Sequence, residues 1–220
     1  DPDTGQQLTW WENIPVLSYL MLRGRSRYSG KRISLQYPMV ELLTMALVLC
    51  CVWRFGFGWQ GFGAILFTCF LVALSGIDLR TQLLPDQLTL PLLWLGLIAA
   101  VENLYIGQKA ALLGVMAGYS SLWAVWWLFK QLTGKEGMGH GDFKLLAALG
   151  AWVGLNGVLP IILLSSLVGA IIGSVWLTMK GRDKATPIPF GPYLAIAGWI
   201  VFFWGKEIID AYLRFSGLRP

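Results

Sequence analysis

Seven apolar runs, separated by short polar segments, constrain this chain more than any other feature. They cover residues 39–57, 62–77, 88–105, 109–129, 143–155 and 158–179, and a last run ends near residue 213. A helix of about 20 apolar residues can cross the hydrocarbon core of a bilayer. With 56% hydrophobic and 13% charged residues, the chain is too apolar for an ordinary soluble domain. The sequence predicts an all-α, polytopic membrane protein with about seven transmembrane helices.

The basic residues predict which helix ends face the cytoplasm. Under this topology, 12 of the 17 Lys and Arg residues fall on one side, five of them before residue 33. An excess of Lys and Arg marks cytoplasmic loops. We therefore expect residues 1–38 to form a cytoplasmic amino-terminal loop, residues 39–213 a membrane-embedded domain, and residues 214–220 a periplasmic tail.

The same distribution argues against nucleic-acid binding despite the net charge of +5, because the basic residues form no continuous face. The three cysteines lie inside apolar runs and show no metal-ligand spacing. Residues 1–9 are polar, so we expect no cleavable signal peptide there. The chain is expected to start in a loop, which is consistent with an upstream segment that the sequence does not contain. Residues 10–20 form either an amphipathic interfacial helix or a partly ordered loop with an aromatic anchor.

Two acids occupy exceptional places in this pattern. Asp78 ends the second apolar run and Asp142 begins the fifth, so both are expected at the cytoplasmic membrane face. Ionisable groups at membrane depth are costly and usually functional. Two neighbouring carboxyl groups do not both ionise easily, and such a pair supplies a base that activates water and an acid that protonates a leaving amine. This is the chemistry of aspartic peptide hydrolysis, and it requires no bound cofactor.

The stretch GMGHGDFK, residues 137–144, surrounds the second acid. We expect Gly139 and Gly141 to allow an extended or left-handed backbone that a substrate strand can approach, and Lys144 to support the loop. Because Asp142 begins a helix, the helix dipole favours it as the ionised partner.

Other interpretations remain open for the two acids. Asp142 could cap a helix, and Asp78 could be a helix-terminal acid paired with Arg80 or Lys144. A different functional class is a membrane transporter or channel that uses Asp78 and Asp142 as proton or cation sites. A third is a scaffold or methyltransferase without peptidase activity.

Three neighbouring features are expected to be structural. Asp86 follows Pro85 at a helix restart, so we expect it to cap that helix. His140, the only histidine, has no cysteine partners for a metal site and is expected to face solvent in a loop. Glycines spaced four apart, at 114 and 118 and again at 169 and 173, predict close helix packing.

Two motifs together resemble the bacterial type IV prepilin peptidase family, which also serves type II secretion. They are IDLRTQLLPDQLTLP at residues 77–91 and GHGDFKLL at residues 139–146. Further similarity is found in WENIP at residues 11–15 and YPMVELL at residues 37–43, so the resemblance covers nearly the whole chain.

This resemblance implies a multi-pass enzyme of the bacterial inner membrane with its active site facing the cytoplasm. Members of the family are aspartic endopeptidases that remove the leader peptides of prepilins and pseudopilins after a glycine. They also methylate the new amino terminus with S-adenosylmethionine. Carried over to this sequence, the catalytic pair is Asp78 and Asp142, and Asp86 is not catalytic.

The chain departs from the family pattern in two places. Many members carry two Cys-x-x-Cys pairs in the amino-terminal loop; here Ser26 and Ser29 replace the second pair, and residues 4–7 hold no counterpart of the first. We therefore predict no zinc. The family usually has eight spans, and we expect this chain to lack the additional first span with its Gly-Ser-Phe-Leu-Asn-like motif. Because both regions are tied to methylation, methyltransferase activity is an expectation separate from the peptidase.

Overall fold

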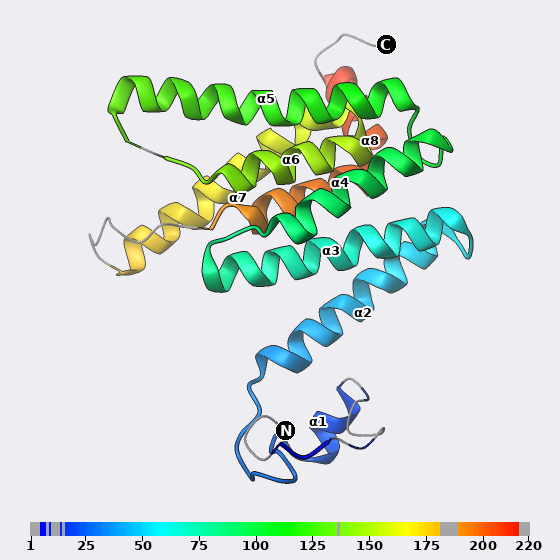
Figure 1. The fold of residues 1–220 in the computed structure, drawn as a ribbon, viewed down its shortest axis with the longest axis vertical. Coiled ribbons are helices and arrows are strands. Elements are labelled where there is room, and N and C mark those ends of the chain that lie inside the picture. The colour runs from blue at the N-terminus through cyan, green and yellow to red at the C-terminus, as the bar shows by residue number, and fades with distance from the viewer. Residues whose placement is uncertain are drawn as a thin grey trace. The chain divides into compact units, whose positions relative to one another are not determined.

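The computed structural model describes residues 5–7, 9, 14, 16–135, 137–180 and 189–215, with side chains omitted for 176–180 and 215. Helices dominate the described residues (Figure 1). They are α1 (Leu17–Met21), α2 (Gln36–Phe55), α3 (Trp59–Thr81), α4 (Asp86–Val101), α5 (Gln108–Thr133), α6 (His140–Val153), α7 (Leu155–Lys180) and α8 (Gly191–Phe215). The chain divides into two compact units, Asp1–Gly56 and Phe57–Pro220.

The first unit contains α1, α2 and a turn between them. Its short bridge joins Arg25 to Arg32. The Ser26 hydroxyl accepts the backbone N–H groups of Tyr28 and Ser29, each at 3.2 Å, so side chain and backbone together close this turn. Helix α1 covers only the end of the predicted amphipathic segment, and Trp10 and Trp11 lie outside the described residues.

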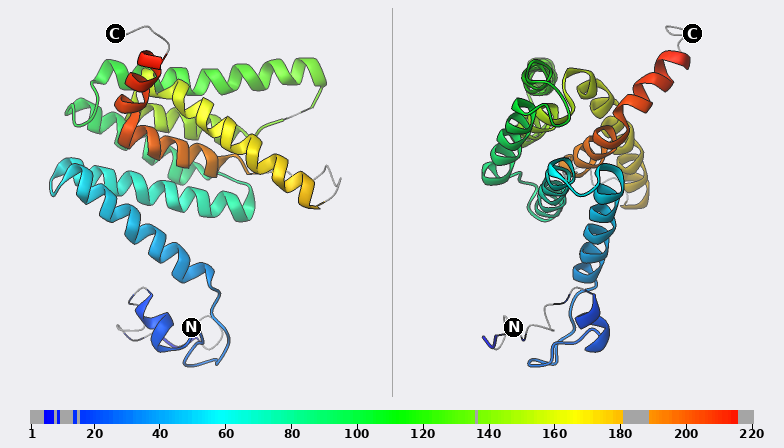
Figure 2. Two further views of the ribbon diagram at one scale, coloured as in Figure 1. Left: turned by 180° about the vertical axis from the view of Figure 1, so that it is seen from behind. Right: turned by 90° about the vertical axis from the view of Figure 1, so that its right-hand side faces the viewer.

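Helix α6 is the centre of the second unit. It packs against α4, α5, α7 and α8, while α3 packs against α4 and α8 (Figure 2). Nearly every residue of α6 after its first turn is buried, as expected for a helix that is apolar on all sides. The Trp152 indole N–H donates to the Leu92 carbonyl at 2.9 Å and fixes α6 against α4.

Glycines bring α5 and α6 into backbone contact. A Cβ atom on Gly114 would lie 2.2 Å from the Gly150 carbonyl oxygen, and one on Gly118 would lie 2.6 Å from the Leu146 carbonyl oxygen. No side chain fits at such distances, so small residues are required there. The prediction that Gly114 and Gly118 serve close helix packing is confirmed.

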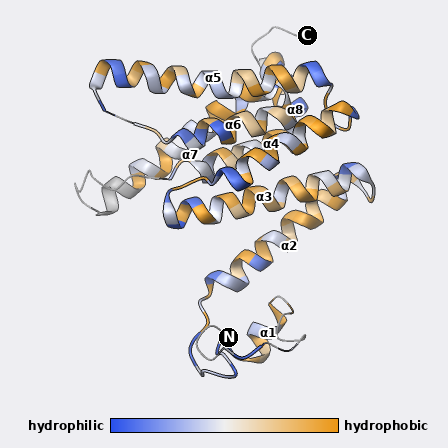
Figure 3. Ribbon diagram, viewed as in Figure 1, coloured by the Kyte–Doolittle hydropathy of each residue, from blue (hydrophilic) through white to orange (hydrophobic). Residues whose placement is uncertain are grey.

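Each predicted apolar run corresponds to one helix, and the all-α, polytopic membrane class is confirmed. Among the described residues, α2, α3, α5 and residues 155–175 of α7 are long and apolar enough to cross a membrane, while α4 is a shorter apolar helix. Hydrophobic residues cover most of the helix lengths and hydrophilic ones gather near helix ends (Figure 3). The number of spans and the side of each loop stay predictions.

Candidate active site

Asp78 lies in the last turn of α3 and is only 4% exposed. One oxygen of its carboxylate, Oδ2, accepts the backbone N–H of Gly191 at 3.0 Å. Gly191 is the first residue of α8 and is 113 positions away in sequence. The acid is thus buried against the start of another helix.

Asp142 lies in the first turn of α6 and is 8% exposed. Its carboxylate accepts a hydrogen bond from the backbone of Gly139, the residue that caps this helix. An acid three positions after the cap residue often reaches back in this way. Asp142 therefore stabilises the start of its own helix, which agrees in part with the capping role considered for it from the sequence.

The structure brings Asp78 and Asp142 together at one end of the second unit. Helix α3 ends there, and α4, α6 and α8 begin there (Figure 1). The Asp78 charge acts directly on Asp142. Leu84 lies close to Gly141, the residue before Asp142, and to Gly191, which binds Asp78: Cβ atoms on these glycines would lie 2.8 and 3.2 Å from its side chain. Asp78 and Asp142 are the only buried charged residues in the described part of the chain.

Asp142 precedes the apolar run of α6, and its environment favours the protonated form. Burial, and to a smaller extent the nearby Asp78 charge, raise the pKa of Asp142 to about 7, although the Gly139 hydrogen bond acts in the opposite direction. Desolvation and a like charge outweigh the helix dipole here. The expectation that Asp142 is the ionised partner is therefore wrong, and this residue keeps its proton below about pH 7.

This proton makes the stability of the protein depend on pH. The pKa of Asp142 is about 7 in the folded protein and 3.8 ordinarily, so stability falls as pH rises through this window. An asparagine pays no ionisation penalty. We expect Asp142→Asn to raise the Tm at pH 8 by about 5 °C and to leave it unchanged at pH 4, measured by thermal melting in detergent. Equal gains at both pH values would contradict the assignment.

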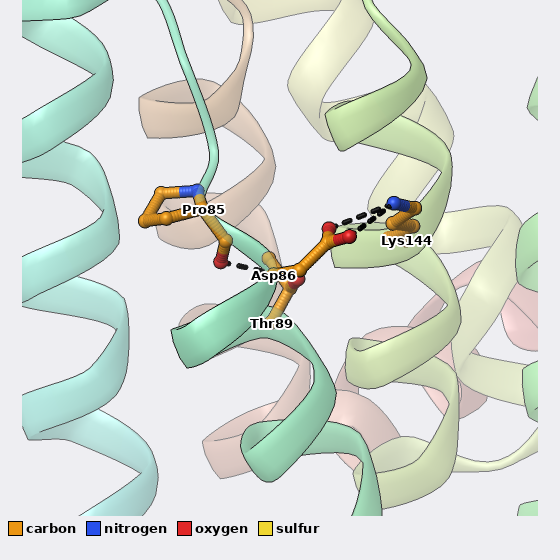
Figure 4. A network of polar contacts seen from close by, with 4 residues as sticks. All are labelled: Pro85, Asp86, Thr89 and Lys144. Carbon is orange, nitrogen blue, oxygen red and sulfur yellow. Dashed lines mark hydrogen bonds and ion pairs between the residues drawn. The ribbon is translucent and has the colours of Figure 1, made fainter.

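Asp86 and Lys144 form a separate polar contact beside the two acids (Figure 4). The Lys144 ammonium group lies 2.7 and 2.8 Å from the two carboxylate oxygens of Asp86. The expectation that Asp86 caps α4 is wrong, because Pro85 occupies the cap position and Asp86 is the first helical residue, with its carboxylate facing Lys144. Lys144 thereby links the start of α4 to the start of α6. Its partner is Asp86 and not Asp78, the other acid considered as its partner from the sequence.

Removing this ion pair should have a small effect. Lys144 and Asp86 are 34% and 52% exposed, and surface pairs contribute less than about 1 kcal/mol. We expect Lys144→Met to lower the Tm by no more than about 3 °C, with less effect at high salt. A much larger loss in thermal melting would show that Lys144 holds the helix ends together.

Gly139 agrees with expectation, whereas Gly141 and His140 differ from it. Gly139 has an extended backbone, but Gly141 and His140 belong to α6 and not to a loop. Gly141 is needed for space, because its Cβ would lie 2.8 Å from the Cβ of Leu84. His140 is exposed, yet its ring packs against Trp126 and Phe143, with centroids 5.0 and 5.4 Å apart.

Sequence reasoning missed Gly191. The available signal was the proline-rich stretch before the seventh run, part of which lies outside the described residues. No group of three or more His, Cys, Asp or Glu side chains that could hold a metal ion occurs in the described part of the chain. The absence of zinc stays a prediction.

A polytopic helical protein with two buried aspartates at one bundle end has the features of a membrane aspartic peptidase. Comparison with known proteins agrees with this class. The model of the type IV leader peptidase family matches residues 65–174, and that of the bacterial peptidase A24 amino-terminal domain matches residues 1–55. The chain belongs to the type IV leader peptidase family. No solved structure matches it significantly.

Several relatives carry the name prepilin leader peptidase/N-methyltransferase. One from Xanthomonas campestris pv. campestris is 75% identical over 219 residues, which is 100% of this chain and 76% of the relative. One from Pseudomonas aeruginosa is 54% identical over 99% of this chain and 75% of its own. One from Aeromonas hydrophila is 52% identical over 96% and 73%. These comparisons give no support to a transporter or channel.

Proposed function

We propose that this protein cleaves the leader peptides of type IV prepilins or type II secretion pseudopilins, after a glycine, at the cytoplasmic face of the inner membrane. Asp78 and Asp142 are the catalytic pair. The observation that supports this proposal best is the burial of the two acids next to each other at one end of the bundle. The family membership supplies the substrate class.

The environments of the two acids suggest how they divide the reaction. The Asp78 carboxylate, which accepts a hydrogen bond from the Gly191 N–H, takes a proton from water as the water oxygen attacks the scissile carbonyl carbon. Asp142, which carries a proton below about pH 7, donates to the carbonyl oxygen. When the C–N bond breaks, the proton held by Asp78 goes to the leaving amine, and Asp142 recovers its own as the carboxylic acid product forms.

Cleavage by the purified protein tests this function. The protein in detergent is incubated with a prepilin, and the two products are separated and weighed by mass spectrometry. A cut directly after the leader glycine is expected. Intact prepilin after prolonged incubation with folded protein would reject the peptidase, and a cut elsewhere would reject the proposed specificity.

Methylation of the new amino terminus is the second part of the proposal. It rests on the names of the relatives, which imply S-adenosylmethionine as methyl donor. A pocket of about 790 Å³ lies between the α4–α5 connection and the α6–α7 junction, at the opposite end from the acids. Its lining contains no acidic residue that would accept hydrogen bonds from the ribose hydroxyl groups, and it lies far from the cleavage site, so we do not assign it to this cofactor.

Methyl transfer can be measured without cleavage. A synthetic peptide that begins at the mature amino terminus is incubated with the protein and radiolabelled S-adenosylmethionine. Incorporated label would establish the second activity for this chain. If folded, cleavage-competent protein incorporates no label, the methylation half is rejected while the peptidase half stands.

A further inference from the structure

The first turn of α8 supplies a third component to the site. Gly191 is buried, and its N–H donates to Asp78 Oδ2 over 3.0 Å. Three helices therefore contribute to the site: α3 through Asp78, α6 through Asp142 and α8 through the Gly191 backbone.

This N–H is free to bind the acid because of its place in the helix. The first N–H groups of an α-helix have no acceptor within the helix. Those of Tyr193 and Leu194 already donate to the Phe190 carbonyl, and Pro192 has no N–H. The Gly191 N–H thus has no acceptor within α8 and lies at the positive end of the helix dipole, where an anionic acceptor such as the Asp78 carboxylate is favoured.

The same position admits no side chain. A Cβ atom on Gly191 would lie 2.7 Å from Asp78 Oδ2 and 3.2 Å from Asp78 Cγ and Leu84 Cδ2. Contacts under 3.0 Å force one of the groups to move, and the nearest group is the carboxylate itself. Glycine is required here for space.

We infer that Gly191 is a positioning residue for leader cleavage: its backbone N–H holds one oxygen of the Asp78 carboxylate, so that the opposite oxygen faces the attacking water. This inference rests on the proposed peptidase function and deepens it. It gives α8 a role in the reaction and accounts for a glycine between Phe190 and Pro192.

The kinetic test compares Gly191→Ala with Gly76→Ala. Gly76 lies two residues before Asp78 on α3, and a Cβ there would meet nothing within 4 Å, so this control should keep wild-type kinetics. For Gly191→Ala we expect kcat to fall about ten- to a hundredfold, the effect of one hydrogen bond to a charged group, with KM nearly unchanged. The acidic limb of its pH–rate profile should move to higher pH by about one unit.

A melting experiment tests the contact without using activity. Gly191→Ala should lower the Tm of the wild type, but much less in an Asp78→Ala background, where the colliding carboxyl group is gone. If Gly191→Ala alone does not fold, recovery of folded protein in the Asp78→Ala background reports the same coupling. An equal loss in both backgrounds would overturn the assigned contact.

The outcomes separate the two proposals. If the wild type cleaves prepilin and Gly191→Ala keeps its kcat and pH profile, the positioning role is wrong and the peptidase stands. If folded wild-type protein cleaves nothing, the proposed function fails and the positioning role falls with it, whatever the melting data show. A loss of kcat with a shifted acidic limb and coupled Tm values supports both.

Discussion

Replacing either Asp78 or Asp142 with asparagine is expected to lower kcat for leader cleavage by at least about a thousandfold. Asparagine keeps the size of the side chain but neither accepts a proton as a carboxylate does nor donates one as a carboxylic acid does. Because both acids act in the same steps, the double variant should be hardly worse than either single one. The measurement is turnover of a purified prepilin, followed by mass spectrometry, with each variant in detergent.

Asp86→Asn is the matched control for Asp78→Asn, because it makes the same substitution at another aspartate of the motif at residues 77–91. Its carboxylate faces Lys144 at the surface, so we expect cleavage within about threefold of wild type. Circular dichroism and Tm show whether each variant is folded. Wild-type turnover by folded Asp78→Asn or Asp142→Asn would rule out the catalytic pair, and complete loss in Asp86→Asn would place a third acid in the reaction.

Gly114→Ala is expected to have the largest effect on stability. Its Cβ would lie 2.2 Å from the Gly150 carbonyl oxygen, which belongs to backbone and does not rotate away. Separating α5 from α6 also disturbs the contact at Gly118, so we expect a loss of about 3 kcal/mol, the upper range for overpacking. Thermal melting in detergent and the yield of folded protein measure it.

Gly76→Ala again serves as the control, because a Cβ at this helical position has open space. It should melt at or slightly above the wild-type Tm, since alanine favours helix over glycine by up to about 1 kcal/mol. An unchanged Tm for Gly114→Ala would mean that α5 and α6 are further apart than described here.

The length and spacing of the apolar runs were sufficient to predict helices α2 to α8. Each run becomes one helix because a backbone in lipid must satisfy its hydrogen bonds within the segment. Both acids were predictable for a related reason: a charge at the end of an apolar run is rare enough to be noticed. Small residues at Gly114 and Gly118 followed from their four-residue spacing.

The remaining features depend on packing between distant segments. The dipole at the start of α6 favoured an ionised Asp142, but burial by neighbouring helices outweighs it. Gly141 was interpreted through backbone freedom, whereas its need for space arises from Leu84 on another segment. The hydrogen bond between Gly191 and Asp78 joins residues 113 positions apart. No local sequence pattern predicts which acid accepts the N–H at the start of α8.

The enclosure of α6 has a consequence for how this protein tolerates different membranes. Helix α6 packs against protein on several sides, through α4, α5, α7 and α8, and its residues after the first turn are almost all buried. Bilayer thickness and lipid composition act on side chains that touch acyl chains, which here belong to the surrounding helices. The helix that carries Asp142 is thus shielded from lipid, and the position of Asp142 in the bundle should depend little on the host membrane.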